Sequence, residues 1–220
     1  MIRVIATLLW NGQTLVKGVG FDAWRSVGQP LQAINVFQMR EVDEILFLDI
    51  TATKEGRRPN FALVEQLAEK CFVPLTVGGG VKSVDDVRDL LRAGADKALI
   101  QSATSVLPAA GEAFGRQAIV WCNEHSDGLH SGLLDGAGEV MLQSRPRDGR
   151  MTGYDIATLK ASPLPVPVIA SGGAGTYEHF AQAIDAGASA VAAGAMWLFT
   201  EQTPLEAKKY LQARGYDVRL

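Results

Sequence analysis

Glycine-rich turns that can hold a phosphate group occur twice in this sequence. Residues 74–103 read PLTVGGGVKSVDDVRDLLRAGADKALIQSA, and the same outline returns at residues 167–196 as PVIASGGAGTYEHFAQAIDAGASAVAAGAM. In both segments the glycines follow a short apolar run and precede the start of a helix, where free backbone N–H groups can bind an anion. A single copy could serve only as a tight turn, but two matched copies favour two phosphate sites.

Residues beside these turns extend the predicted phosphate sites. Glycine has no Cβ, so its backbone N–H can approach phosphate oxygens closely, and hydroxyl or amide side chains can add further donors. The candidate phosphate-binding residues are Gly80, Gln101, Ser102, Gly149, Gly173, Gly194 and Ala195.

Two aspartates and a lysine are candidates for chemistry. Asp49 ends the apolar run FLD and Asp148 lies in RDG, positions where a general acid or base would be needed. An aspartate at such a place can equally cap the next turn or pair with a neighbouring lysine, and both alternatives stay open for Asp49. Lys17 follows the turn at Asn11 and Gly12 and could neutralise a phosphate or clamp a carboxylate, although a lone loop lysine is more often solvated.

The elements that must position these residues are eight short strands. Most are nearly continuous apolar runs, which is typical of strands buried on both faces of a parallel sheet. The runs cover residues 4–9, 44–50, 73–77, 97–101, 118–122, 139–143, 166–170 and 189–194, and most connections between them carry a helical pattern. Eight alternating units in a chain of this length predict a (β/α)₈ TIM barrel. Its active site would lie at the carboxyl ends of the strands.

The repeat indicates that the barrel consists of two duplicated half-barrels. Ser83 and Thr176 occupy equivalent N-cap positions, and Gly94 and Gly187 close the two helices. One connection departs from the pattern, because the short segment between the strands at 118–122 and 139–143 contains four glycines. We therefore expect the fifth helix to be shortened or missing.

Length and composition narrow the class of protein. The 220 residues, 47% hydrophobic and 20% charged, predict a single α/β domain over residues 1–220. With a net charge of −3 and scattered basic residues, the chain has no footprint for nucleic acid. No membrane span or signal peptide is visible, which predicts a cytoplasmic protein. Cys71 and Cys122 stand in apolar contexts that predict buried thiols.

Neither a metal nor an organic cofactor is predicted. His125, Asp127 and His130 lie close together in the glycine-rich segment, but their spacing is weak evidence for a metal site.

Charged residues also occur at the opposite ends of the strands, where they are more informative. Residues of alternating sign stand at or just before four strand starts, where they can form a ring of ion pairs that stabilises the barrel: Arg3, Glu44, Lys97 and Glu139.

Several segments together resemble a known family. They are FLDITATKEGR, PLTVGGGVKSVDDVRDLLRAGADK, GAGEVML, RDG, GYD and PVIASGGAGTYEHF. They are similar to the cyclase subunit of imidazole glycerol phosphate synthase over nearly the whole chain. The resemblance implies a (β/α)₈ barrel whose substrate carries a phosphate at each end. It also implies that a separate glutaminase subunit docks at the bottom of the barrel and supplies ammonia. The products are an imidazole ring and an aminoimidazole carboxamide nucleotide.

The resemblance also assigns roles to individual residues. It places Gly80, Gln101 and Ser102 at one phosphate and Gly173, Gly194 and Ala195 at the other. The charges at the strand starts, Arg3, Glu44, Lys97 and Glu139, would form the gate through which ammonia enters.

The sequence departs from the family at two catalytic positions. The aspartate expected after the first strand is replaced by Leu8 or Leu9, and a leucine cannot transfer a proton. The aspartate expected after the fifth strand falls near Asn123 or Glu124, and Glu124 could replace it chemically. Gln101 stands where the family has asparagine. The predicted catalytic set is Asp49, Asp148, Lys17 and Glu124.

Three functions follow from these observations. The leading prediction is a cyclase-type lyase or synthase subunit in histidine biosynthesis, with a glutamine amidotransferase partner. The TLLWNGQ opening also resembles a divergent branch of the family. It predicts the alternative of a catalytically weakened barrel partner of an amidotransferase in surface polysaccharide sugar amidation. A third possibility is an isomerase acting on the preceding intermediate, but it too needs strand-end aspartates.

Overall fold

Eight parallel strands close into a barrel in the computed structural model, which describes residues 1–124, 135–161 and 164–220. The barrel strands are β1 (Arg3–Trp10), β4 (Glu44–Asp49), β5 (Leu75–Gly78), β6 (Lys97–Ile100), β7 (Ile119–Glu124), β8 (Glu139–Gln143), β9 (Val168–Ser171) and β10 (Ala190–Ala193). Neighbours follow chain order, and β10 pairs in parallel with β1 to close the ring. The predicted (β/α)₈ barrel is therefore confirmed, with all eight strands where the apolar runs placed them.

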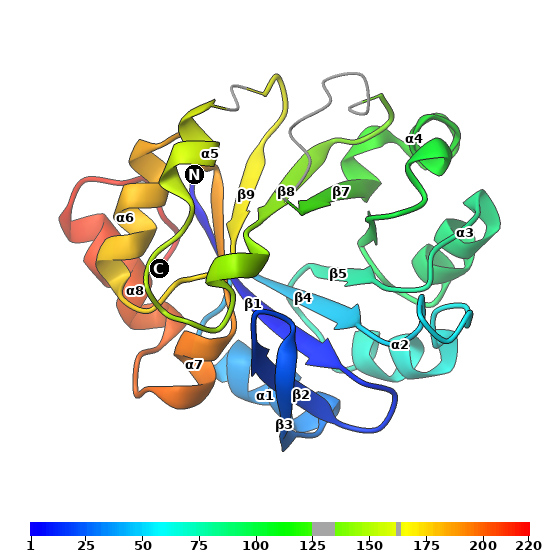
Figure 1. Ribbon diagram of the computed structural model, residues 1–220, viewed down its shortest axis with the longest axis horizontal. Coiled ribbons are helices and arrows are strands. Elements are labelled where there is room, and N and C mark those ends of the chain that lie inside the picture. Colours follow the sequence, from blue (N-terminus) through cyan, green and yellow to red (C-terminus); the bar gives the residue numbers. More distant parts are fainter. Residues whose placement is uncertain (125–134, 162–163) are drawn as a thin grey trace.

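Helices form the outer layer around the strands (Figure 1). They are α1 (Pro30–Met39), α2 (Phe61–Ala68), α3 (Val84–Arg92), α4 (Leu107–Phe114), α5 (Ile156–Ala161), α6 (Tyr177–Asp185), α7 (Ala195–Phe199) and α8 (Pro204–Ala213). The short helix α7 was not predicted. The prediction of a reduced fifth helix falls mainly on residues 125–134, which lie outside the described residues. None of the described helices is long and apolar enough to cross a membrane.

Two apolar clusters explain why the strand sequences are almost continuously hydrophobic. The larger cluster packs one face of the strands against the helices and includes Val4, Phe37, Leu90 and Phe180. The smaller one fills the barrel itself and consists of Ile5, Leu46, Leu99, Val120, Cys122, Met141, Ile169, Ala190 and Ala192. Both faces of each strand are buried, so apolar residues occupy successive positions instead of alternating with polar ones.

The two glycine-turn copies share their backbone conformation at both ends of the helix. Ser83 and Thr176 precede α3 and α6 with φ of −144° and −143°. Gly94 and Gly187 follow the helices with φ of +98° and +106°, a left-handed conformation that glycine adopts readily. The copies differ in one contact, since Ser83 forms a capping box with Asp86 whereas Thr176 makes no side-chain cap bond.

A β-hairpin that the sequence reading missed follows the first barrel strand. Strands β2 (Leu15–Val19) and β3 (Asp22–Gly28) are antiparallel, and β2 also pairs with β1. In Figure 1 the hairpin stands outside the ring of barrel strands. The backbone N–H of Gly20 at its tip donates to the carbonyl of Asp148 at 2.9 Å. Lys17 therefore lies in a strand, not in a loop.

Candidate active site

The sequence-predicted binding and chemical residues gather at the carboxyl ends of the barrel strands. They line two cavities there, one of about 20 Å³ and one of about 540 Å³. Leu9 and Gln143 contribute to both, so the cavities adjoin each other at one mouth of the barrel. This is the end at which (β/α)₈ enzymes bind their substrates.

The small cavity brings together four of the predicted phosphate residues. They are Gly149, Gly173, Gly194 and Ala195. Glycine is required at two of these positions by close backbone approach. A Cβ on Gly173 would lie 2.2 Å from the carbonyl oxygen of Gly153, and one on Gly149 would lie 2.2 Å from that of Gly18. Ser171 adds a hydroxyl-bearing side chain to the same cavity wall. The wall therefore presents backbone and small polar groups suited to an anion.

Lys17 and Asp148 form a buried ion pair beside the small cavity. The Lys17 Nζ atom lies 2.8 Å and 2.7 Å from the two carboxylate oxygens of Asp148. The residues are only 3% and 7% exposed. The expectation of a solvated loop lysine was wrong, because β2 carries Lys17 inward to a carboxylate 131 residues away. The pair links the hairpin to the loop that follows β8.

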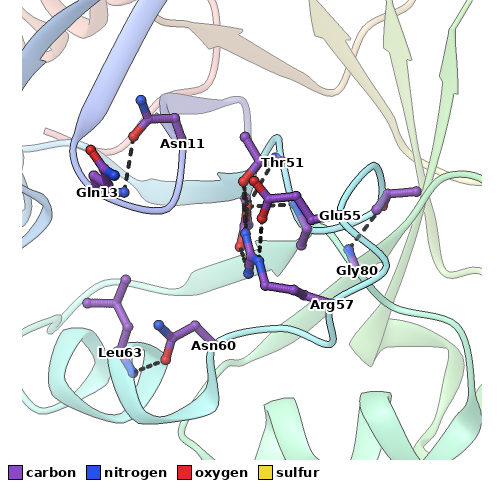
Figure 2. A network of polar contacts seen from close by, with 11 residues as sticks. Asn11, Gln13, Thr51, Glu55, Arg57, Asn60, Leu63 and Gly80 are labelled. Atoms are coloured by element: carbon purple, nitrogen blue, oxygen red, sulfur yellow. Dashed lines mark hydrogen bonds and ion pairs between the residues drawn. The ribbon is translucent and has the colours of Figure 1, made fainter.

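Asp49 is fully engaged by its own loop. One carboxylate oxygen accepts hydrogen bonds from the backbone N–H groups of Thr51 at 3.1 Å and Ala52 at 3.0 Å. The other accepts from Arg57 at 3.1 Å, and Arg57 also contacts Thr51 and Glu55 (Figure 2). Both structural alternatives for Asp49 are thus realised, with arginine as the partner in place of lysine. Asp49 also lines the large cavity.

The first glycine turn and its neighbours lie on the wall of the large cavity. Gly80, Gln101 and Ser102 all contribute to it. The Gly80 N–H already donates to the hydroxyl of Thr53 at 3.2 Å (Figure 2), so a ligand would share or replace that bond. Lys54 extends along the same wall, exposed and without a charged or hydrogen-bonded partner among the described residues.

Within each pair of neighbouring candidates, one residue lines a cavity and the other does not. On β1, Leu8 packs in the outer core while Leu9 lines both cavities. On β7, Glu124 lines the large cavity whereas Asn123 does not. The Gln101 amide donates to a Glu124 carboxylate oxygen at 2.5 Å, which orients that carboxylate at the mouth. The mouth thus has a carboxylate at the end of β7 and an apolar side chain at the end of β1.

Cys122 lies two residues before Glu124 on β7, and its thiol does not supply a nucleophile. Burial raises the pKa of its thiol well above the ordinary value, so the group stays protonated. Within the described part of the chain, no group of three or more His, Cys, Asp or Glu side chains is placed to hold a metal ion. His125, Asp127 and His130 lie outside the described residues.

The predicted ring of charges closes at the opposite end of the barrel. Arg3 lies 2.7 Å from Glu44 and 2.9 Å from Glu139, and Lys97 lies 3.0 Å and 3.2 Å from the same two carboxylates. Each residue is the first of its strand. Burial alone would lower the pKa of Arg3, but the two carboxylates raise it above its ordinary value. The Thr76 hydroxyl donates to Glu44 at 2.6 Å and ties the ring to β5.

Comparison with known proteins gives the family. The family model described as histidine biosynthesis protein matches residues 3–122 and 124–203. This chain belongs to that family. The imidazole glycerol phosphate synthase subunit HisF of Endomicrobium trichonymphae is 40% identical over 247 aligned positions, which cover 99% of this chain and 95% of the relative. The HisF subunit of Thermobifida fusca (strain YX) is 37% identical over 252 positions, covering 99% and 98%.

The match covers the barrel and both cavities, and it confirms the resemblance read from the sequence. Both alignments are longer than the 220 residues of this chain, so the relatives contain residues that it lacks. The family match is interrupted at position 123, directly before Glu124.

Sequence reasoning missed the cavity residues that lie away from the strand ends. Phe21 and Trp24 on the hairpin, and Thr53 and Lys54 in the turn after β4, all line the large cavity. Two aromatic residues in a segment that also contains four glycines were the available signal for the hairpin pair.

Proposed function

We propose that this chain is the cyclase-type barrel subunit of an imidazole glycerol phosphate synthase in histidine biosynthesis. It would use ammonia on a nucleotide ligand that carries a phosphate at each end. One observation carries the proposal beyond family membership: two glycine-lined cavities adjoin at one mouth of a barrel whose other end is closed by a charged ring. A ligand with two separated phosphates matches this pair of cavities.

The two cavities would share the binding of the ligand. Gly149, Gly173, Gly194 and Ala195 would hold one phosphate with the help of Lys17, whose ammonium keeps a donor beyond those facing Asp148. Gly80, Gln101 and Ser102 would hold the other, with Lys54 as an available cation. The reacting centre would then lie between the cavities, near Leu9 and Gln143.

Proton transfer would depend mainly on Glu124. Its carboxylate is oriented by Gln101 and faces the large cavity. Asp49 and Asp148 would act through charge, because Asp49 is held by Arg57 and Asp148 by Lys17. The end of β1 offers only Leu9, so one side of the mouth would have no proton-transferring group.

Ammonia would reach this centre through the barrel. A glutaminase partner would dock on the face that carries Arg3, Glu44, Lys97 and Glu139. The apolar cluster inside the barrel separates that ring from the cavities, and its side chains carry no charge that would retain ammonium.

The test is turnover with ammonium salt in place of the partner. Purified protein with the doubly phosphorylated aminoimidazole carboxamide nucleotide is expected to release imidazole glycerol phosphate. The Leu9→Asp variant, which supplies a carboxylate at the end of β1, is expected to be faster. Turnover of neither protein above a no-enzyme control would contradict the cyclase function.

Leu9 favours a second candidate function, the catalytically weakened partner of an amidotransferase in surface polysaccharide sugar amidation. In that role the barrel would still bind an anionic ligand and receive ammonia. Stimulation of a glutaminase by the barrel, without any cyclase turnover, would distinguish this function from the first.

A further inference from the structure

Trp24 contributes an aromatic side chain to the lining of the large cavity. It lies on β3 and lines the cavity together with Phe21. Its ring packs closely on the neighbouring strand, because a Cβ on Gly18 would lie 3.0 Å from the Trp24 Cε3 atom. Gly18 also coincides with the register irregularity between Lys17 and Val19. The absence of a side chain at position 18 therefore lets the indole lie against the backbone of β2.

The hairpin that carries Trp24 is held on both sides. At its tip, Arg145 lies 5.3 Å over the ring of Phe21, and Gly20 donates to the carbonyl of Asp148. On the outer strand, the Arg25 guanidinium lies 4.0 Å over the ring of Phe199 in α7. An aromatic surface fixed in this way loses little conformational entropy when a ligand binds.

The lining of the large cavity combines two kinds of chemical group. Gly80, Ser102 and Lys54 supply glycine backbone, hydroxyl and ammonium groups. Phe21 and Trp24 add aromatic rings to a lining that also contains aliphatic side chains and the charged side chains of Asp49, Glu124 and Arg145. A cavity that offers both anion-binding groups and aromatic rings suits a ligand in which a phosphate is attached to a flat ring.

We propose that Trp24 is a specificity-determining residue that stacks on the planar nitrogen heterocycle of a phosphorylated ligand. The identity of that heterocycle, an aminoimidazole carboxamide, rests on the proposed function. Stacking itself requires no turnover, so a binding measurement tests it independently of catalysis.

The fluorescence of Trp24 provides the measurement. All four tryptophans lie in the described part of the chain, and Trp10, Trp121 and Trp197 are only 7%, 3% and 2% exposed. Trp24 is the partly exposed one. Titration with aminoimidazole carboxamide ribonucleotide is expected to quench its emission. Ribose 5-phosphate, which lacks the heterocycle, is expected to bind without quenching, and Trp24→Phe is expected to abolish the signal.

Calorimetry on variants then distinguishes how much of the binding affinity comes from stacking and how much from an ordered hairpin. Trp24→Ala is expected to weaken nucleotide binding by about 5- to 150-fold, the range for loss of one base–aromatic stack. Its affinity for ribose 5-phosphate should stay unchanged. Trp24→Phe keeps a planar face and should retain nucleotide affinity within about threefold. Arg25→Ala removes the contact between β3 and α7 but no residue that lines the cavity. This variant should also retain nucleotide affinity within about threefold.

Several results would overturn the inference. These are equal weakening of both ligands by Trp24→Ala, an Arg25→Ala effect as large as that of Trp24→Ala, and no effect of Trp24→Ala. If Trp24→Ala does not fold, Trp24→Leu keeps an apolar side chain without a flat face and is expected to show the same selective loss. Failure of the wild-type protein to bind either compound would also overturn the inference, whereas the proposed function is judged separately by turnover.

Discussion

At the scale of single residues, the ends of β7 and β1 contribute different chemical groups to the mouth of the barrel. Glu124 lines the large cavity and accepts a hydrogen bond from Gln101, while the end of β1 contributes the apolar side chain of Leu9 to the same cavity. A positioned general acid or base contributes about 10²- to 10⁴-fold to a rate. Under the proposed function, most of that contribution has to come from Glu124.

We therefore expect Glu124→Gln to lower ammonium-dependent kcat by about 100-fold or more, with little change in KM, because the amide keeps the shape but not the proton transfer. The control is Glu112→Gln, the same change at an exposed position on α4. Steady-state kinetics of both variants provide the measurement. Equal kcat for Glu124→Gln and wild type would exclude Glu124 as the proton-transferring group.

The pair of Lys17 and Asp148 makes a prediction about stability. Lys17→Met would leave the 7% exposed carboxylate of Asp148 without its cation. Breaking a buried pair in this way costs about 3–5 kcal/mol in the free energy of unfolding. Urea denaturation should show this loss, a partial recovery in Lys17→Met/Asp148→Asn, and almost no change in the exposed control Lys209→Met. A single variant as stable as the control would contradict the structural role of the pair.

At the scale of elements, the barrel strands could be read from the sequence and the hairpin could not. Burial on both faces gives the barrel strands apolar runs that stand out. Strand β3 is exposed at most positions and has no such pattern, and α7 has only five residues. The rule that sites follow strand ends selected Asp49 and Gly80, and both residues line the large cavity. It could not separate Leu8 from Leu9, because only the pleat decides which side chain enters the mouth.

The N-termini of α3 and α6 occupy equivalent positions in the two repeats, so the contributions of their N-cap residues to stability can be compared. Ser83 accepts a hydrogen bond from the Asp86 N–H at 3.1 Å, whereas Thr176 makes no side-chain cap bond. Loss of an N-cap bond costs about 1 kcal/mol. Ser83→Ala is therefore expected to lower the free energy of unfolding by about that amount, and Thr176→Ala by much less. Equal losses in urea denaturation would show that the cap bond is not the source of the difference.

At the scale of the whole molecule, the barrel separates two kinds of chemistry along one axis. Paired charges close the end where Arg3 and Glu44 begin their strands, and anion-binding turns open at the other end. Between them lies the inner apolar cluster around Leu46 and Met141. Neutral ammonia can cross such an interior at much lower cost than ammonium, because burial of an unpaired charge is strongly unfavourable.

Under the proposed function, this arrangement predicts that removing a charge from the ring affects turnover with glutamine more than turnover with ammonium. Lys97→Met removes a cation that lies 3.0 Å from Glu44 and 3.2 Å from Glu139. With a glutaminase partner, glutamine-dependent turnover should fall by about tenfold, equivalent to about 1.4 kcal/mol in the barrier. Ammonium-dependent turnover should be retained, because added ammonia can enter directly at the mouth. Lys209→Met serves as the control, and an equal fall of both activities would mean that the ring stabilises the barrel without guiding ammonia.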